Sequence, residues 1–180
     1  MRSILGKLFL CLSFVCVACS ARAVTVTFSD ANLETAVRDA FTALGQPLGG
    51  TIDSTDLANP LFTTLNASGL GITDLEGLQF CTALTTLDLS NNQITSIAQL
   101  QPLASLATLD IGYGDPFASP GGVFPPVNNA ANNITDISPI ASHASLVYLN
   151  IGGNPNLTDI STLTTLPTLA KLWLGFQNIQ

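Results

Sequence analysis

Basic residues are scarce in this chain of 180 residues, which carries 5 lysines and arginines against 12 aspartates and glutamates. The resulting net charge of −7 repels phosphate backbones and anionic lipid, so it argues against binding to nucleic acid or acidic membranes. Histidine occurs only once. With a single histidine, the sequence offers no nucleophile–base pair and no set of metal ligands. It therefore predicts no enzyme, no metal and no cofactor.

The first 23 residues have the layout of a secretory signal peptide. A positive start at Arg2 and Lys7 precedes an apolar stretch over 8–19, and residues 21–23 form a small-x-small cleavage site. The apolar stretch is too short to cross a bilayer comfortably. We therefore expect a mature chain that begins near Val24, has no transmembrane segment, and is secreted or displayed at the cell surface.

Cysteine is almost absent once this leader is removed. Cys81 would be the single remaining thiol, so no internal disulfide could form and stability must come from packing. Cys19 ends a segment that faintly resembles a bacterial lipobox. Lipid attachment through Cys19 is therefore the less favoured alternative to release as a free protein.

A leucine-rich pattern recurs along the rest of the chain. Residues 84–97 read L-x-x-L-x-L-x-x-N-x-I-x-x-I, and the same frame starts again at 62, 106, 146 and 169. The starts are 22 or 23 residues apart, except that the step from 106 to 146 holds an insertion at 114–131. That insertion is rich in proline and glycine and has no periodicity, which predicts a loop. The regular return predicts stacked repeats.

Each repeat can be understood as one short strand and a return segment that cannot bury its own apolar side. Stacking the units buries a continuous core, with the strands paired in parallel. Asn92, Asn132 and Asn154 stand where the chain leaves each strand. A buried asparagine there can bond backbone groups of adjacent coils, so we expect these three residues to form a structural ladder.

These motifs resemble the bacterial internalin-type leucine-rich-repeat family. The closest matches are I-T-D-L-E-G-L over 72–78 and L-D-L-S-N-N-Q-I over 87–94, and the resemblance covers essentially the whole mature chain. It implies an α/β fold: a right-handed solenoid with a concave parallel β-sheet, a convex side of 3-10 turns and loops, and a small helical N-terminal cap. Because members generally serve as extracellular ligand-binding surfaces, it also implies a non-catalytic protein-binding module.

Two other functions stay open beside protein binding, whose ligand the sequence does not name. The chain could be a carbohydrate-binding adhesin, with a glycan as ligand, or a non-catalytic arm of a larger secreted or surface protein. The last repeat is incomplete, because residues 177–179 correspond to 92–94 and the chain then stops. We therefore expect a fragment whose full version carries more repeats, a C-terminal cap or an attachment domain.

The residues before the repeats predict a helical cap over 24–60, followed by about 4.5 repeats over 61–180. Leu33, Val37, Phe41 and Leu44 recur at helical spacing, which predicts a helix over 30–44 that Ser29 or Asp30 caps and that stops at Gly45. A shorter helical turn is expected to begin near Ser54. This cap would cover the apolar end of the first coil.

Strand alternation predicts which side chains lie on the concave face. Aromatic residues dominate protein-binding hot spots, which favours Tyr148 and Trp173. Asp88 and Asp110 would stack as like charges about 4.8 Å apart, which a bound cation or basic partner would relieve, although solvent also screens exposed carboxylates. The candidate ligand-binding residues of this face are Asp88, Asp110, Tyr148, Asn150, Lys171 and Trp173.

Three aromatic residues at the insertion form a second candidate site. Tyr113, Phe117 and Phe124 could be exposed anchors for a ligand. The alternative is that the two phenylalanines fold back onto the solenoid. His143 and Cys81, by contrast, align with leucines at inward positions of other repeats. We expect them to be a core histidine with its hydrogen bonds satisfied and a buried thiol.

Overall fold

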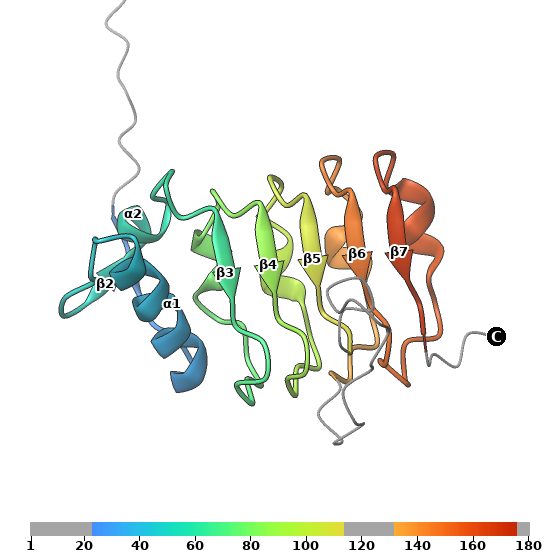
Figure 1. The fold of residues 1–180 in the computed structure, drawn as a ribbon, viewed down its shortest axis with the longest axis horizontal. Helices are drawn as coiled ribbons and strands as arrows, with labels where there is room; N and C mark the ends of the chain where they lie inside the picture. The colour runs from blue at the N-terminus through green and yellow to red at the C-terminus, as the bar shows by residue number, and fades with distance from the viewer. Residues whose placement is uncertain (1–22, 114–131, 176–180) are drawn as a thin grey trace, which may run out of the picture.

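The structure is a computed structural model that describes residues 23–113 and 132–175. The N-terminal part forms a small unit of two short strands and two helices, and a series of strands joined by 3-10 turns follows it (Figure 1). The elements of the first part are β1 (Thr25–Val26), α1 (Ala31–Ala43), β2 (Ile52–Asp53) and α2 (Ser54–Leu57). The strands of the second part are β3 (Thr64–Asn66), β4 (Thr86–Asp88), β5 (Thr108–Asp110), β6 (Tyr148–Asn150) and β7 (Lys171–Trp173).

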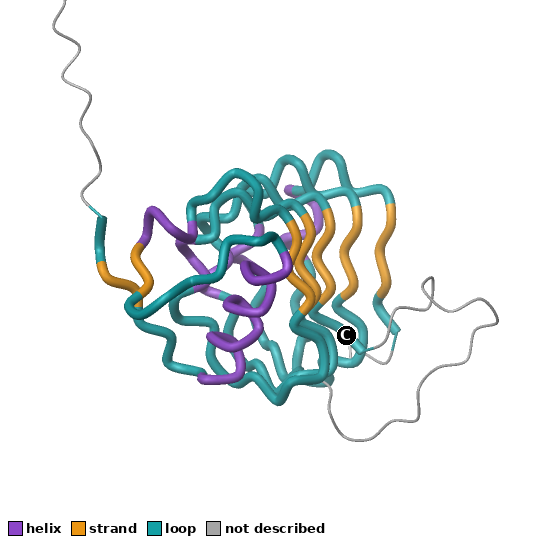
Figure 2. The backbone as a smooth tube through the Cα atoms, turned by 60° about the vertical axis from the view of Figure 1, so that its left-hand side comes forward, coloured by secondary structure: helices purple, strands orange, loops and turns teal. Residues whose placement is uncertain are grey.

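The repeats form one parallel sheet in which the strand order follows the chain order, β3-β4-β5-β6-β7. The strands lie side by side on one side of the molecule (Figure 2). The 3-10 turns between them are η1 (Leu78–Phe80), η2 (Ala98–Leu100), η3 (Ser138–Ile140) and η4 (Ser161–Thr165). The register pairs the middle leucine of every strand with that of the next, as Leu87 with Leu109. The predicted fold class, a leucine-rich-repeat solenoid with a helical start, is confirmed.

The core is a column of leucines and isoleucines shared between successive coils. Leu87, Leu109 and Leu149 in the middle of β4, β5 and β6 are fully buried. Each such side chain contributes about 1.5–3 kcal/mol when water is excluded from it. The equivalent Leu172 of β7 is 36% exposed, because no further coil of the described residues packs against it. Burial in this fold therefore depends on having a neighbouring coil on both sides.

Helix α1 covers the other end of this core. The Asp30 side chain caps it by accepting hydrogen bonds from the backbone N–H groups of Asn32 and Leu33. The ring of Phe41, on the buried face of α1, packs against that of Phe62 in the first repeat with centroids 4.5 Å apart. The sequence-based bounds of 30–44 are thus right to within one residue at each end.

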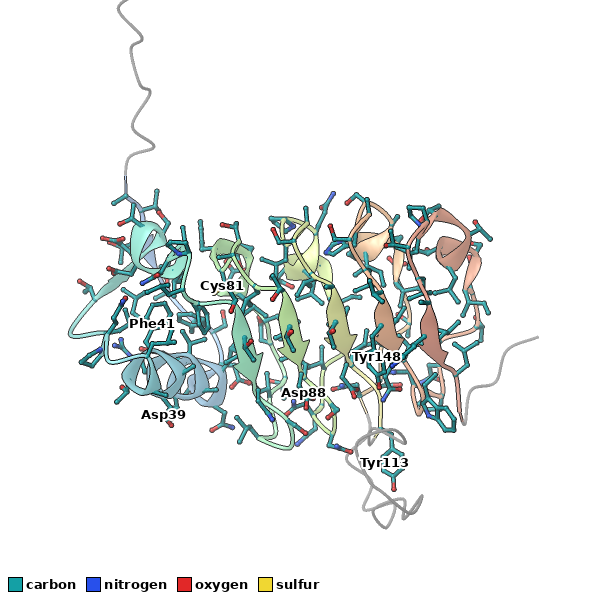
Figure 3. All side chains as sticks on the ribbon, turned by 45° about the horizontal axis from the view of Figure 1, so that its top comes forward. Asp39, Phe41, Cys81, Asp88, Tyr113 and Tyr148 are labelled. Atoms are coloured by element: carbon teal, nitrogen blue, oxygen red, sulfur yellow. The ribbon has the colours of Figure 1, made fainter. Side chains whose placement is uncertain are left out.

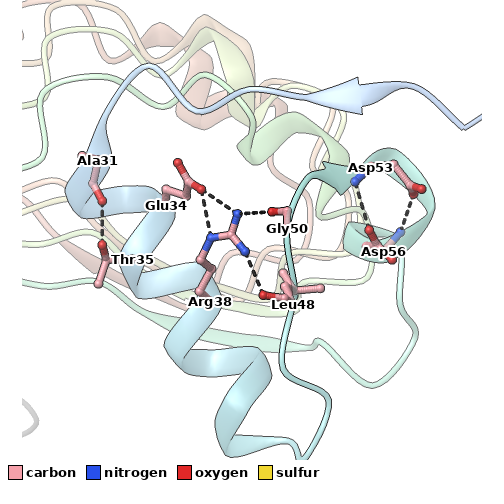
Figure 4. A network of polar contacts seen from close by, with 8 residues as sticks. All are labelled: Ala31, Glu34, Thr35, Arg38, Leu48, Gly50, Asp53 and Asp56. Atoms are coloured by element: carbon pink, nitrogen blue, oxygen red, sulfur yellow. Dashed lines mark hydrogen bonds and ion pairs between the residues drawn. The ribbon is translucent and has the colours of Figure 1, made fainter.

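Polar contacts fix this cap to itself and to the first repeat. The Arg38 guanidinium forms an ion pair with Glu34 and donates to the carbonyls of Leu48 and Gly50 (Figure 4). Asp30 has a second role, because its Oδ2 accepts from the backbone N–H of Thr73 at 2.8 Å and from the Thr73 hydroxyl at 3.1 Å. One carboxylate therefore both starts the helix and joins it to the turn of the first coil.

Buried asparagines join the coils where the chain leaves each strand. Asn132 donates to the carbonyls of Leu89 and Ile111, and its Oδ1 accepts from the N–H of Ile94. Asn92 and Asn154 make the same kinds of bond one coil earlier and one coil later. Because each side chain bridges two coils, it satisfies backbone groups that stacking alone would leave unpaired.

Several predicted features lie outside the described residues: the signal peptide, Cys19, and the insertion with Phe117 and Phe124. Within residues 23–113 and 132–175, no helix is both long enough and apolar enough to cross a membrane.

Candidate functional site

The outward side chains of strands β3–β7 form one continuous surface, which we call the open face. Its two columns are in strict register, so that Tyr148 stands between Thr108 and Lys171, and Asn150 between Asp110 and Trp173. The first column contains Thr64, Thr86, Thr108, Tyr148 and Lys171, and the second contains Asn66, Asp88, Asp110, Asn150 and Trp173.

The second column has a structural task that the sequence analysis missed. Each of its aspartates and asparagines accepts, through Oδ1, a hydrogen bond from the backbone N–H two residues further on. The donor to Asp88 is Ser90 at 2.9 Å, and the donor to Asp110 is Gly112 at 3.0 Å. Asn66 and Asn150 accept in the same way from Ser68 and Gly152. These side chains therefore turn the chain at the end of each strand.

Asp110 and Asn150 were expected to be exposed on this face, and that expectation is wrong. Asp110 is only 6% exposed and Asn150 is fully buried, with Asn150 Nδ2 donating to Asp110 Oδ2 at 3.1 Å. Glycines explain the difference. A Cβ on Gly112 would overlap the Asn150 side chain, and one on Gly152 would overlap the Trp173 ring. The missing side chains let Asn150 and Trp173 pack down onto the backbone, whereas earlier coils carry Ser68 and Ser90 at the equivalent positions.

This packing gives a first testable prediction. Gly112→Ala should lower the free energy of unfolding by about 1–3 kcal/mol, because the added methyl group must displace the Asn150 side chain from Asp110. Gly49→Ala is the matched control, since a Cβ there meets nothing within 4 Å. Urea denaturation of both variants measures the difference. Equal stability of the two variants would show that Asn150 moves aside freely.

The like-charge stack of Asp88 and Asp110 needs no bound cation. Asp88 Oδ1 accepts from the Ser90 backbone and from the Ser90 hydroxyl at 2.7 Å, and that hydroxyl is also 2.8 Å from the Ser68 hydroxyl. Asp110 is bonded to Gly112 and Asn150. Protein donors already stabilise both carboxylates. Asp88 and Asp110 therefore stabilise the turns at the ends of their strands and are weak candidates for ligand contact.

The most accessible part of the predicted site is a smaller group, Tyr148, Lys171 and Trp173, which we call the β6–β7 patch. Lys171 is exposed, and Tyr148 and Trp173 are half-buried. Figure 3 shows Tyr148 and Asp88 on strands of the same sheet, β6 and β4, with β5 between them. Among residues 23–113 and 132–175, Arg38 is the other basic residue, and its guanidinium is engaged by Glu34. The patch therefore places two aromatic side chains beside Lys171, the basic residue that is not paired with Glu34.

Tyr113 was proposed as an exposed anchor, and the structure contradicts this, because its side chain is only 7% exposed. Figure 3 places it beyond the end of the sheet, where the chain leaves β5. The side chain of Tyr113 is therefore buried and is not available as an exposed anchor. A tyrosine ring buries a large apolar area when it packs in this way, which favours that position over full exposure.

Cys81 and His143 are both buried in the core, as expected from their alignment with leucines. Burial raises the pKa of the Cys81 thiol to about 12, so it stays neutral and unreactive. The expectation that His143 has its hydrogen bonds satisfied is wrong, because neither ring nitrogen has a partner. Burial lowers the pKa of its imidazole, and the nearby carbonyls of Leu100 and Ile140, which favour the protonated ring, offset this only in part.

Among the described residues, no three histidine, cysteine, aspartate or glutamate side chains are placed to hold a metal ion together. The open face has two parts. One is formed by the threonines and turn-forming side chains of β3–β5, and the other is the β6–β7 patch. Such a surface is suited to contact with a ligand, since the inward leucines of strands β3–β6 are buried and hold these strands in place.

Comparisons with known proteins agree with this geometry. The family described as "Leucine Rich repeats (2 copies)" matches residues 63–105, whereas a comparison with curated proteins gave no match. Among solved structures, the chain is similar to an internalin, InlF, from Listeria monocytogenes, with a TM-score of 0.60 and 23% sequence identity over 85% of this chain. Residues 63–105 therefore match leucine-rich repeats, and the fold of the chain is similar to that of a Listeria internalin.

The functional domain of a second Listeria internalin, InlJ, matches 85% of this chain with 24% identity and a TM-score of 0.40. This chain covers 45% of the InlF chain and 38% of the InlJ chain, which is less than half of each.

Proposed function

We propose that this chain is a non-catalytic extracellular module that recognises a protein ligand through the β6–β7 patch. Leucine-rich-repeat modules of the internalin type are typically protein-binding, which supports the general class. The observation that carries the finer proposal is the register of β6 and β7, which pairs Tyr148 with Lys171 and sets Trp173 beside Asn150. Two aromatic side chains and a cation thus share one edge of the open face.

The physical case for the patch rests on its preorganisation. Leu149, between Tyr148 and Asn150, is fully buried, so β6 cannot shift without exposing core. Tyrosine and tryptophan supply large contact areas with few rotatable bonds, and their burial by a partner costs little conformational entropy. The small side chain of Thr108 extends the surface beside Tyr148. A partner protein can therefore lie across the sheet and anchor on the aromatic end.

The net charge of −7 favours partners that carry basic surfaces. An acidic protein attracts basic partners over several ångströms and repels acidic ones, which acts mainly on the rate of association. The signal-peptide layout of residues 1–23 supports an extracellular setting for the encounter. We therefore propose a basic or mixed-charge extracellular protein as the ligand.

The test is a panel of purified secreted and cell-surface proteins, with affinities measured by biolayer interferometry. For a protein that binds, Tyr148→Ala and Lys171→Ala are each expected to weaken the affinity about 5- to 30-fold, the range for a hot-spot contact worth 1–2 kcal/mol. Thr86→Ala is the matched control, since Thr86 lies in the same column but two strands away from Tyr148. It should bind as the unaltered chain does.

Unchanged circular dichroism is needed for each variant, so that a lost contact is distinguished from a lost fold. Equal affinities of Tyr148→Ala, Lys171→Ala and Thr86→Ala would place the contact surface elsewhere and contradict the proposal. Binding in a parallel glycan array, with no protein bound, would instead favour a carbohydrate ligand, because tyrosine and tryptophan also stack on sugars.

A further inference from the structure

His143 is an unusual residue at an inward position of the solenoid. It follows η3 in the coil that contains β6, and its side chain is fully buried with both ring nitrogens unpartnered. The equivalent positions in the coils before and after it are Leu103 and Leu166, both buried. A polar ring thus occupies a site that neighbouring coils fill with leucine, which is costly even when the ring is neutral.

The surroundings of His143 offer no charge that could stabilise its protonated form. On one side lies the segment from η2 to Leu106, on the other the segment 161–170, whose Thr165 and Thr168 hydroxyls bond the carbonyls of Ala141 and Ala144. Neither segment contains a titratable side chain. The nearest carboxylates along these coils, Asp136 and Asp159, are exposed and accept hydrogen bonds from Ser138 and Ser161.

We propose that His143 is an acid-sensitive lock, whose protonation releases the coils of β6 and β7 from the rest of the solenoid. The nearby carbonyls of Leu100 and Ile140 offset only part of the cost of burying a charged imidazole, so the coil around it must open to hydrate the ring. In a repeat protein each coil is held by its neighbours alone, so one end can open while the other stays folded. The half that opens carries Tyr148, Lys171 and Trp173.

The direction of the pH dependence follows from linkage. The native interior favours neutral imidazole, so the folded pKa lies below the ordinary value of 6.5. Above pH 6.5 the ring is neutral in both states and contributes no pH dependence. Below 6.5 the opened coil binds a proton that the closed coil does not, and the opening equilibrium constant rises up to about tenfold per pH unit. The rise stops at the folded pKa.

Two residues of the chain report on the two halves separately. Trp173 is the single tryptophan, and its ring packs on Gly152 and Gly175, so its fluorescence follows the β6–β7 half. Cys81 is buried in the coil between β3 and β4, so its alkylation, read by peptide mass spectrometry, reports opening of the first half. Urea titrations of the full chain at pH 7.5 and pH 5 then follow both halves at once.

The expected result is that lowering the pH from 7.5 to 5 moves the Trp173 transition to lower urea. The alkylation of Cys81, expressed relative to that of the fully unfolded chain at the same pH because acid itself lowers the thiolate fraction, should not change at those urea concentrations. In His143→Leu, which restores the residue type of Leu103 and Leu166, the Trp173 transition should keep the same position at both pH values. His143→Met is a second neutral replacement, in case leucine packs poorly, and should behave in the same way.

Three results would overturn the proposal. The Trp173 transition of the unaltered chain could be independent of pH, it could shift equally in both His143 variants, or the two halves could open together. If the proposed function is right, the chain should also release its partner at pH 5; this expectation rests on the proposed function, whereas the folding measurement does not. Acid opening without loss of binding would therefore refute binding through the β6–β7 patch but not the role of His143.

Discussion

Asn132→Ala should lower the free energy of unfolding by about 3–5 kcal/mol. The side chain accepts from the N–H of Ile94 and donates to the carbonyls of Leu89 and Ile111, all in the fully buried interior. Its removal takes the acceptor from the Ile94 N–H, at a cost of about 1–3 kcal/mol for a donor that water cannot reach. The carbonyls of Leu89 and Ile111 each lose one bond, worth about 0.5–1.5 kcal/mol, and keep the bonds from Asn92 and Asn154. Urea denaturation followed by far-UV circular dichroism measures the change.

Asn133→Ala is the matched control for this prediction. Asn133 is the next residue along the chain and is exposed, and its side chain accepts from the exposed Asn156. Its replacement should change the free energy of unfolding by less than about 0.5 kcal/mol, as is usual for surface positions. If Asn132→Ala were no more damaging than Asn133→Ala, the asparagine ladder would not be what holds the coils in register.

The second large effect is expected at the junction between the cap and the repeats. Asp30→Ala should cost about 2–4 kcal/mol, because it removes the N-cap bonds to Asn32 and Leu33 and the bonds from Thr73 at once. Asp39→Ala removes a carboxylate from the exposed side of the same helix and should be nearly neutral. Thermal or urea unfolding of the two variants decides between them.

The effect of Asp30 should also depend on pH. Burial raises the pKa of its carboxyl, but the bonds from Thr73, Leu33 and Asn32 outweigh burial and leave the pKa below the ordinary 3.8. A lowered pKa means that the ionised carboxylate stabilises the fold above pH 3.8 and that this contribution is lost as the pH falls through the folded pKa. The stability gap between Asp30→Ala and the unaltered chain should therefore narrow in strong acid. A gap that is constant down to pH 2 would contradict this role.

Much of the fold could be predicted from the sequence because the repeat leaves few alternatives. Leu87 and its equivalents recur every 22 or 23 residues, apart from the step that holds the insertion. They can be buried only if the coils stack, which fixes the order and register of the strands. The helix over 31–43 was equally accessible, since Asp30 and Gly45 mark its ends. These are local signals that tertiary contacts reinforce.

The site was less accessible to sequence analysis, because side-chain alternation says where a residue points and says little about what covers it. Asp110 and Asn150 point outward as predicted and are nevertheless buried, since Gly112 and Gly152 allow them and Trp173 to pack closely. Gly112 and Gly152, standing where Ser90 stands in an earlier coil, were the available signal. The contact of Asp30 with Thr73 spans 43 residues of sequence, and no local pattern announces it.

That the ring nitrogens of His143 have no hydrogen-bond partner could not be predicted from local sequence either. Alignment with Leu103 and Leu166 predicted its burial, but whether a carbonyl meets its ring depends on how three coils stack. The acid sensitivity that we infer therefore arises from packing and could not be predicted from the repeat.

Site-specific photocrosslinking from the open face tests the central claim most directly. A benzophenone side chain is placed at Tyr148, or at Ser96 on an exposed turn outside the strands, and each chain is irradiated with the protein that the binding panel identifies. Our account predicts a covalent adduct from position 148 and none from position 96. An adduct from position 96, with none from 148, would contradict recognition through the β6–β7 patch.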